Sequence, residues 1–297
     1  MKIVILDAYT VDQGELSWSG LEEFAEVEIY ERTSPEEVIP RCKGAEIVLT
    51  NKVILDATIL NMLPRLQYIG VLATGYNVVD MEDANIQYIV VTNIPAYSTE
   101  SLAQMVFCHL LNIVGRVDHY ARENKQGKWV SSPDFCYLDH HLFELSGKKM
   151  GIIGLGNTGM ATARIASSFG IQVFAYTSKD EEELPFSIKK ADMDTIFQQC
   201  DIVSLHCPLT EKTRHLVNSE RLSSMKPSSI LINTGRGPLV DDKAVAEALK
   251  NETIAAYGAD VLTTEPATAD NPLLNAPNCY LTPHIAWATQ EARLRLI

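Results

Sequence analysis

A run of closely spaced glycines near the middle of the chain limits its possible folds more than any other feature. Gly154, Gly156 and Gly159 form a G-x-G-x-x-G pattern. The pattern follows the apolar stretch Met150–Ile153 and precedes Met160–Phe169, an alanine-rich stretch that we predict to be helical. In such a unit the glycines permit a tight turn, a close approach to a pyrophosphate, and close helix–strand packing, while the helix N-terminus attracts phosphate. The segment predicts a dinucleotide-binding unit; a turn whose glycines serve packing alone is the alternative.

Short apolar runs alternate with helical stretches on both sides of this turn. Continuous apolar runs of this length are typical of parallel strands buried on both faces. In the first third of the chain the predicted strands are Ile3–Leu6, Val27–Tyr30, Glu46–Thr50, Tyr68–Ala73 and Tyr88–Asn93. Further along they are Met150–Ile153, Gln172–Tyr176, Asp201–His206, Ser229–Asn233, Ile254–Asp260 and Tyr280–Thr282. The pattern predicts an α/β protein with two doubly wound parallel-sheet domains in tandem.

The join between the two domains is predicted near residues 93–98. Pro95 ends a strand there, and Ser101 with Gln104 has the spacing of a capping box at the start of a long helix. We therefore place the first domain at 1–98 and the second from 99. Residues 118–147, which are rich in charge and aromatic side chains, are long for a plain connection. They are predicted either to form an arm that packs on a second subunit or to cover their own domain.

Composition excludes several classes of partner. The chain has 297 residues, 25 Lys and Arg against 38 Asp and Glu, and a formal net charge of −13. Such a surface repels phosphate backbones and anionic lipid, so neither nucleic acid nor membrane is expected as a partner. Six scattered cysteines without a Cys-x-x-Cys pair, and no recognisable signal peptide, predict reduced thiols in a cytoplasmic protein. No spacing of His, Cys or acidic residues predicts a metal site.

The strand after the glycine turn bears on the choice of nucleotide. An NAD-binding unit usually has an acid about twenty residues on that holds the ribose 2′-hydroxyl. Here Thr177 takes that place, followed by Ser178 and Lys179. A hydroxyl does not repel a 2′-phosphate, and a lysine can pair with one. The sequence therefore does not decide between NAD(H) and NADP(H) as the cofactor. Tyr-x-x-x-Lys, phosphate-loop, H-E-x-x-H and G-x-S-x-G patterns are missing from the sequence.

Three strand ends in the second domain carry the remaining chemistry. Arg236 lies between two glycines after one predicted strand. Asp260 and Glu265 follow another, and His284 follows a third. Because ligands of open α/β sheets bind outside the carboxyl ends of the strands, we expect these side chains to converge.

These motifs, in this order, resemble the D-isomer-specific 2-hydroxyacid dehydrogenases. The segments that match this family are the glycine turn at 151–159, Ser204–Thr210, Asn233–Gly237, Ala259–Val261 with Glu265 and Pro266, and Thr282–His284. Two further segments, Leu72–Asn77 and Tyr97–Thr99, look most like the hydroxypyruvate reductase (glycerate dehydrogenase) branch. The resemblance covers nearly the whole chain. It implies a flavodoxin-like substrate domain at 1–98, to which 286–297 returns, and a Rossmann cofactor domain at 99–285 with a dimerisation arm at about 118–147.

The resemblance implies a role for each residue of the catalytic group. Arg236 would grip the substrate carboxylate and polarise the keto oxygen, as a guanidinium fork can. His284 would protonate that oxygen, and Glu265 would orient the imidazole and favour its charged form. The backbone of Ala73, Thr74 and Gly75 would complete the carboxylate site. The implied cofactor-binding residues are Thr99, Gly154, Gly156, Asn157, Thr158, Gly159, Thr177, Ser178, Lys179, His206, Cys207, Pro208, Thr213, Thr234, Gly235, Arg236, Asp260 and His284.

The expected activity is reduction of a small 2-keto acid, with hydroxypyruvate or glyoxylate favoured, by NAD(P)H in a homodimer. A dinucleotide-sensing binding protein, like the corepressors of the same family, is the alternative. Family members continue beyond the point that corresponds to Ile297, so we expect a shortened chain.

Overall fold

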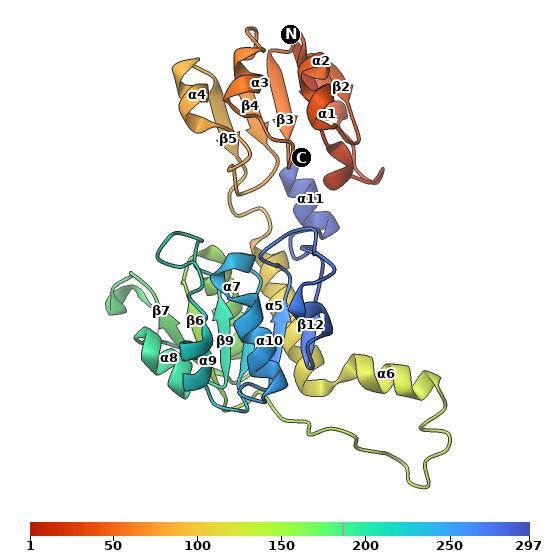
Figure 1. Ribbon diagram of the computed structural model, residues 1–297, viewed down its shortest axis with the longest axis vertical. Helices are drawn as coiled ribbons and strands as arrows, with labels where there is room; N and C mark the ends of the chain where they lie inside the picture. Colours follow the sequence, from red (N-terminus) through yellow and green to blue (C-terminus); the bar gives the residue numbers. More distant parts are fainter. Residues whose placement is uncertain (186) are drawn as a thin grey trace. The chain divides into compact units, whose positions relative to one another are not determined.

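The computed structural model describes residues 1–185 and 187–297 and divides into two compact units. The first comprises Met1–Ser98 together with Ala288–Ile297, and the second comprises Thr99–Trp287. Both are parallel α/β sheets with helical connections (Figure 1). The prediction of two doubly wound α/β domains is confirmed.

The first unit contains a five-stranded sheet in the order β2-β1-β3-β4-β5. This is the flavodoxin-like strand order, as expected. The strands are β1 (Lys2–Ile5), β2 (Glu26–Ile29), β3 (Ile47–Thr50), β4 (Tyr68–Val71) and β5 (Val90–Asn93). The helices are η1 (Ala8–Thr10), α1 (Ser19–Glu22), η2 (Pro35–Glu37), α2 (Val38–Cys42), α3 (Ala57–Asn61), α4 (Met81–Ile86) and α11 (Gln290–Leu296).

The C-terminal helix α11 is held in the first unit by its arginines. Arg293 donates to the carbonyl of Val11 at 3.3 Å and to the carboxylate of Glu15 at 2.5 Å. Arg295 donates to the carbonyl of Tyr97 at 2.8 Å. These bonds connect the last residues of the chain to the unit that its first residues build.

The second unit contains a seven-stranded sheet in the order β12-β11-β10-β9-β6-β7-β8. Its strands are β6 (Lys149–Ile153), β7 (Gln172–Tyr176), β8 (Ile188–Lys190), β9 (Ile202–Leu205), β10 (Ile230–Asn233), β11 (Ala256–Ala259) and β12 (Cys279–Leu281). The order extends the Rossmann arrangement by one strand, β12. The sequence did not predict β8, because a short edge strand with two lysines lacks the apolar run of a buried strand.

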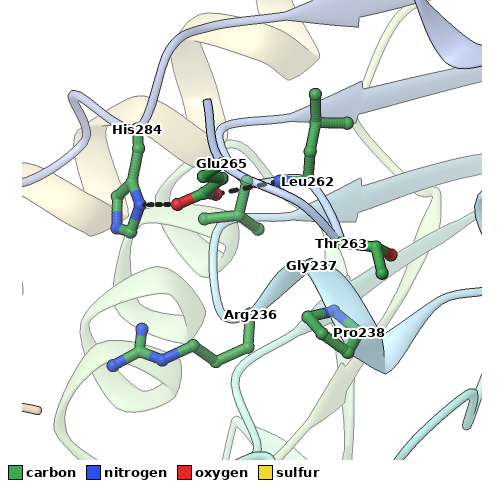
Figure 2. Close-up of a pocket in the computed structure, with 8 residues that line it drawn as sticks. Arg236, Gly237, Pro238, Leu262, Thr263, Glu265 and His284 are labelled. Carbon is green, nitrogen blue, oxygen red and sulfur yellow. Dashed lines mark hydrogen bonds and ion pairs between the residues drawn. The ribbon is translucent and has the colours of Figure 1, made fainter. Parts of the chain in front are cut away.

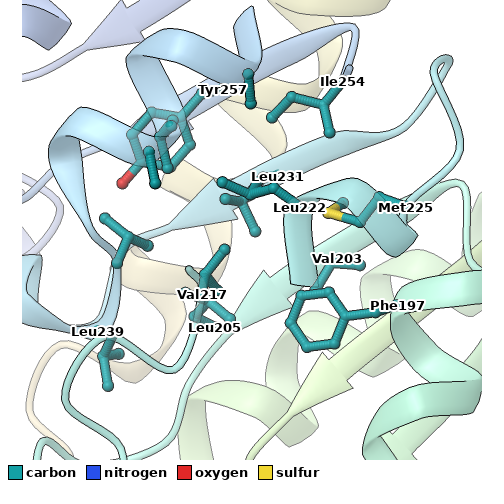
Figure 3. Close-up of a cluster of buried hydrophobic side chains, with 14 of the residues drawn as sticks. Phe197, Val203, Leu205, Val217, Leu222, Met225, Leu231, Leu239, Ile254 and Tyr257 are labelled. Atoms are coloured by element: carbon teal, nitrogen blue, oxygen red, sulfur yellow. The ribbon is translucent and has the colours of Figure 1, made fainter. Parts of the chain in front are cut away.

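The helices of the second unit cover both faces of this sheet. They are α5 (Thr99–Gly115), α6 (Val117–Lys125), α7 (Asn157–Ser168), η3 (Glu181–Glu183), α8 (Met193–Gln199), α9 (Ser219–Ser224), η4 (Gly237–Leu239), α10 (Asp242–Lys250) and η5 (Pro272–Asn275). On one face the core includes Phe197, Leu205 and Tyr257, packed with side chains of α8, α9 and α10 (Figure 3). On the other face α5 and α7 pack together over the sheet.

The predicted capping box at the start of the long helix is wrong. Helix α5 begins at Thr99, so Ser101 lies inside its first turn. The Ser101 side chain is buried and donates to the carbonyl of Ala286 at 2.6 Å. A partner 185 residues away in the chain therefore takes the hydroxyl that the local pattern assigned to a cap.

Helix α6 and the loop after it project away from the rest of the second unit (Figure 1). Hydrogen bonds form within the segment: Trp129 Nε1 donates to the backbone carbonyl of Phe135 at 2.9 Å, and the Tyr137 hydroxyl donates to the Asn124 side chain at 2.7 Å. Phe135 is nevertheless 88% exposed and Leu138 75%. The segment is thus ordered by its own polar contacts while it exposes apolar side chains.

Among the helices of the described residues, none has the length and apolar character needed to cross a membrane.

Candidate active site

The glycine turn has the geometry that a bound pyrophosphate requires. Gly154 has a φ of +96°, and an added Cβ there would lie 2.7 Å from the backbone nitrogen of Cys207. A Cβ on Gly159 would lie 2.2 Å from the carbonyl oxygen of Gly154. By contrast nothing lies within 4 Å of a Cβ built on Gly156, so the backbone there is open to a ligand. The three positions thus match the tight turn, the ligand approach and the close packing of a dinucleotide site.

Helix α7 begins earlier than its sequence indicated. We predicted its start at Met160, but Gly156 is the N-cap and Asn157 the first helical residue. The helix continues to Ser168, so Asn157 and Thr158 belong to its first turn. Their backbone N–H groups therefore lie at the turn, where the positive end of the helix dipole favours a phosphate.

The loop after β7 carries Thr177, Ser178 and Lys179 at the carboxyl edge of the sheet. The Lys179 N–H donates to the Thr177 hydroxyl at 3.2 Å, which forms a compact turn. The carbonyl of Lys179 accepts from the Lys190 ammonium at 2.5 Å. The turn therefore has a neutral hydroxyl at Thr177. That this residue faces the 2′ position of the ribose stays a prediction.

His206, Cys207 and Pro208 follow β9 at the same edge. The His206 ring is 2.9 Å from the Ser204 hydroxyl, and Thr213 donates to the carbonyl of Pro208 at 2.7 Å. Removal of the ring from water lowers the pKa of His206 to about 4. His206 is therefore uncharged at neutral pH and is a poor source of a proton.

The turn after β10 presents Arg236. The buried side chain of Asn233 makes two hydrogen bonds to the backbone of this turn. Asn233 Nδ2 donates to the Arg236 carbonyl at 3.0 Å, and Asn233 Oδ1 accepts from the Gly235 N–H at 3.1 Å. The Arg236 side chain is exposed, with one bond of 2.8 Å to the Gly235 carbonyl. Within the described chain, the buried hydroxyl of Thr234 has no hydrogen-bond partner, as expected where a polar ligand is to be bound.

His284 and Glu265 form an ion-pair geometry beside this turn. His284 Nδ1 is 2.6 Å from Glu265 Oε2, and the other carboxylate oxygen accepts from the Leu262 N–H at 3.0 Å. Figure 2 shows the carboxylate between the imidazole and the backbone of Leu262. Arg236, Glu265 and His284 line one pocket of about 180 Å³. The convergence expected of these three side chains is therefore present in the second unit.

Asp260 holds the segment that carries His284. Its Oδ1 accepts from the Thr282 hydroxyl at 2.6 Å and from the Ile285 N–H at 2.9 Å, and its Oδ2 accepts from the Ala286 N–H at 2.7 Å. We predicted a contact between Asp260 and the cofactor. The structure shows hydrogen bonds from the residues around His284 to the Asp260 carboxylate. The contact with the cofactor stays a prediction.

Comparison with known proteins places these features in one family. Residues 107–286 match the family model described as D-isomer specific 2-hydroxyacid dehydrogenase, NAD binding domain. A hydroxypyruvate reductase of Blautia hydrogenotrophica is 44% identical, with 100% of this chain and 94% of the relative covered. This chain belongs to the D-isomer-specific 2-hydroxyacid dehydrogenases.

Other relatives of this dehydrogenase extend the likeness. A glycerate dehydrogenase of Methylorubrum extorquens is 39% identical over 98% of this chain and 91% of its own. A glyoxylate reductase of Korarchaeum cryptofilum is 34% identical over 95% and 86%. Among solved structures, the TT0316 protein of Thermus thermophilus has a TM-score of 0.89 and 32% identity, covering 100% of this chain and 93% of its own. An acyclic imino acid reductase in complex with NADPH and D-Arg has a TM-score of 0.86 and 28% identity over the same shares.

The dehydrogenase therefore binds a nicotinamide dinucleotide, and its glycine turn, helix α7 and the unpartnered Thr234 hydroxyl fit that group. The choice between NAD and NADP is open. No three His, Cys, Asp or Glu side chains in the described ranges come together as a metal site requires.

Ala73, Thr74 and Gly75 lie in the first unit, in the loop after β4. Asn93 Nδ2 donates to the Thr74 carbonyl at 2.7 Å, and the Thr74 hydroxyl donates to the Ile94 carbonyl at 3.1 Å. These bonds shape the loop, and its part in a substrate site stays a prediction.

The sequence analysis did not identify two residues that contact the site. Trp287 donates its indole N–H to the carbonyl of His284 at 2.8 Å. His109, in the middle of α5, lies 3.2 Å from the Thr282 hydroxyl. A single histidine in a largely apolar helix gives no signal of this kind, because its partner is remote in sequence.

Proposed function

We propose that this dehydrogenase reduces a small 2-keto acid, hydroxypyruvate or glyoxylate, to the corresponding 2-hydroxy acid with NADH or NADPH. The observation that carries the proposal is the pocket in which Arg236, Glu265 and His284 meet at the carboxyl edge of the nucleotide-binding sheet. The names of the relatives, which include hydroxypyruvate reductase, glycerate dehydrogenase and glyoxylate reductase, favour these substrates.

The three side chains have complementary tasks in this proposal. Arg236, exposed in the pocket, pairs with the carboxylate of the keto acid and draws electron density from the keto oxygen. His284 holds its Nδ1 against Glu265, so its Nε2 is the atom that delivers a proton to that oxygen. Glu265, itself fixed by the Leu262 N–H, sets the ring's orientation and stabilises its positive charge.

A bound nicotinamide supplies the hydride, which this chain cannot. The protein's own contribution is to hold the dinucleotide at the glycine turn and the first turn of α7, and to place the proton donor and the carboxylate clamp beside it.

The direct test is turnover of purified enzyme against a panel of glyoxylate, hydroxypyruvate, pyruvate and a branched 2-keto acid, each with NADH and with NADPH. We expect the highest kcat/KM with hydroxypyruvate or glyoxylate. An enzyme that binds NADH but turns over none of these acids would contradict the proposal and favour a dinucleotide-sensing protein.

We predict that Thr177→Asp shifts the cofactor preference towards NADH. The new carboxylate accepts from a ribose hydroxyl and repels a 2′-phosphate, so the ratio of kcat/KM with NADH to that with NADPH should rise about tenfold or more. Thr177→Asn, which has the same shape without the charge, is the matched control. If the ratio stays unchanged in the Asp variant, the 2′ pocket lies elsewhere.

We also propose that the arm of residues 118–147 joins two copies of the chain as a homodimer. An exposed set of apolar side chains held on a self-ordered loop favours a protein partner. Phe135→Ser with Leu138→Ser should convert the dimer to monomer in sedimentation velocity, since truncated hot-spot residues cost about 2 kcal/mol or more each. Phe24→Ser, at a position 70% exposed in the first unit, is the control. A wild-type monomer, or an unchanged dimer in the double variant, would refute the proposal.

For the location of the enzyme we propose the cytoplasm, because its cysteines are scattered and unpaired.

A further inference from the structure

His109 is a buried histidine whose ring fits closely against its neighbours. It lies on the inner side of α5, 5% exposed, among buried apolar side chains of the same helix such as Val106 and Leu110. Opposite it on β11 is Gly258, where an added Cβ would come within 2.9 Å of His109 Cβ and 3.1 Å of its Cγ. The glycine therefore leaves the space that the imidazole fills.

The hydrogen bonds of His109 have a defined direction. The Asp260 carboxylate can only accept, so the Thr282 hydroxyl, 2.6 Å from Oδ1, donates its single proton there. The Thr282 oxygen is then an acceptor towards His109 Nε2 at 3.2 Å, and that nitrogen carries the proton. Burial lowers the pKa of His109, against the opposing effect of the Asp260 charge, and so favours the neutral ring.

This hydrogen-bond chain ends on the backbone around His284. Asp260 accepts from the N–H groups of Ile285 and Ala286, and its own carbonyl accepts from the His284 N–H at 2.8 Å. His284 has a φ of +55°, a left-handed conformation that a residue with a side chain adopts only where its surroundings impose it. The Asp260 carboxylate thus clamps both residues that follow the strained position.

We propose that His109 is a positioning residue: through Thr282 it fixes the Asp260 carboxylate and so holds the turn that aims His284 at the substrate. The inference rests on the proposed function, in which His284 delivers the proton. An apolar residue at 109 would fill the same volume, but it would leave the Thr282 oxygen without a donor. The Thr282 hydroxyl, which donates to Asp260, would then lose the contact that fixes its own orientation.

The test compares two substitutions of His109 that differ in one hydrogen-bond donor. His109→Leu removes the donor, and His109→Gln places an amide N–H near the position of Nε2. We expect the Leu variant to lose about tenfold or more in kcat, since small displacements of a catalytic group have effects of this size, with the KM for the keto acid and the Kd for NADH within about twofold of wild type. The Gln variant should recover most of that loss. Leu110→Met, a change of shape at the neighbouring buried position, should leave kcat within about twofold.

A second pair of variants tests the same chain if His109→Leu does not fold. Thr282→Val removes the hydroxyl and Thr282→Ser keeps it, so Val should lose kcat as His109→Leu does and Ser should not. A readout apart from activity is nitrogen NMR of labelled histidine, in which we expect the wild-type His109 ring as the neutral Nε2–H tautomer and a changed signal in Thr282→Val.

The results separate this inference from the proposed function. Equal losses in His109→Leu and His109→Gln, or a Leu variant with wild-type kcat while His284→Asn is inactive, would overturn the positioning role alone. A wild-type enzyme that turns over no keto acid, or a fully active His284→Asn variant, would instead overturn the proposed function and this inference with it.

Discussion

Replacement of His284 by asparagine should lower kcat/KM for keto-acid reduction by about 10²- to 10⁴-fold, the usual contribution of a general acid. The imidazole is the titratable group that lies 2.6 Å from Glu265 and lines the pocket with Arg236. Asparagine keeps polarity and approximate size but cannot deliver a proton, so the loss should appear at every pH tested. The measurement is steady-state kinetics with the best keto acid of the panel, together with the Kd for NADH, which should remain close to that of wild type.

Glu265→Gln extends this prediction to the charge of the pair. Glutamine can still accept from the Leu262 N–H, but it no longer stabilises a positively charged imidazole. We expect a smaller loss than in His284→Asn, and no further loss when the two changes are combined, because both residues are proposed to act on one proton transfer. His141→Asn, the same substitution at an exposed arm histidine, is the control. Additive losses in the double variant would mean that Glu265 acts elsewhere.

His206 is another histidine at the carboxyl edge of this sheet, directly after β9. With a pKa of about 4, it is protonated in about one molecule in a thousand at pH 7. A reduction that depended on His206 would fall as pH rises through about 4 and would be nearly lost at neutrality. Strong reduction at pH 7 in the wild type, lost in His284→Asn, would therefore assign the proton to His284.

Replacement of Arg236 by alanine is the second change with a large expected effect. Loss of a charge-assisted bidentate contact costs about 2–4 kcal/mol, which corresponds to a decrease in kcat/KM of tens- to several hundred-fold. KM for the keto acid should rise and kcat should fall, because the proposed role of the guanidinium is both to bind the carboxylate and to polarise the keto oxygen. The Asn233 bonds that shape the turn use the Arg236 backbone, so the alanine variant should keep its fold.

Arg236→Lys separates charge from geometry in this prediction. Lysine keeps the positive charge but cannot form the planar fork, so its kcat/KM should lie between those of wild type and Arg236→Ala. Thermal unfolding of all three proteins checks that the differences do not arise from stability. Near-normal kcat/KM in the alanine variant would remove Arg236 from the substrate site.

The fold class could be predicted from the sequence because the residues that indicate it are neighbours in the chain. A G-x-G-x-x-G turn between an apolar run and an alanine-rich helix needs neighbouring residues only, and so do the short β-branched runs of the buried strands. The observed ends of the strands differ from the predicted ends by a residue or two. The reason is that the last hydrogen-bonded residue pair of two strands depends on the partner strand as well. Strand β8 was missed because an exposed edge strand has no apolar pattern.

The order of Arg236, Glu265 and His284 after successive strands was enough to predict that they would meet, because the carboxyl ends of parallel strands share one edge. The contacts that hold them could not be predicted in this way. Ser101 bonds to Ala286, which is 185 residues away in the chain, and His109 bonds to Thr282, which is 173 residues away. Asp260 accepts from the N–H groups of Ile285 and Ala286, which are 25 and 26 residues away. Such bonds form only once α5, β11 and β12 pack together, since a side chain's local sequence does not contain the partner that burial will impose on it. The sequence by itself determined the two parallel sheets and the placement of Arg236, Glu265 and His284 after successive strands. The tertiary structure decided which polar groups hold the loops that carry them.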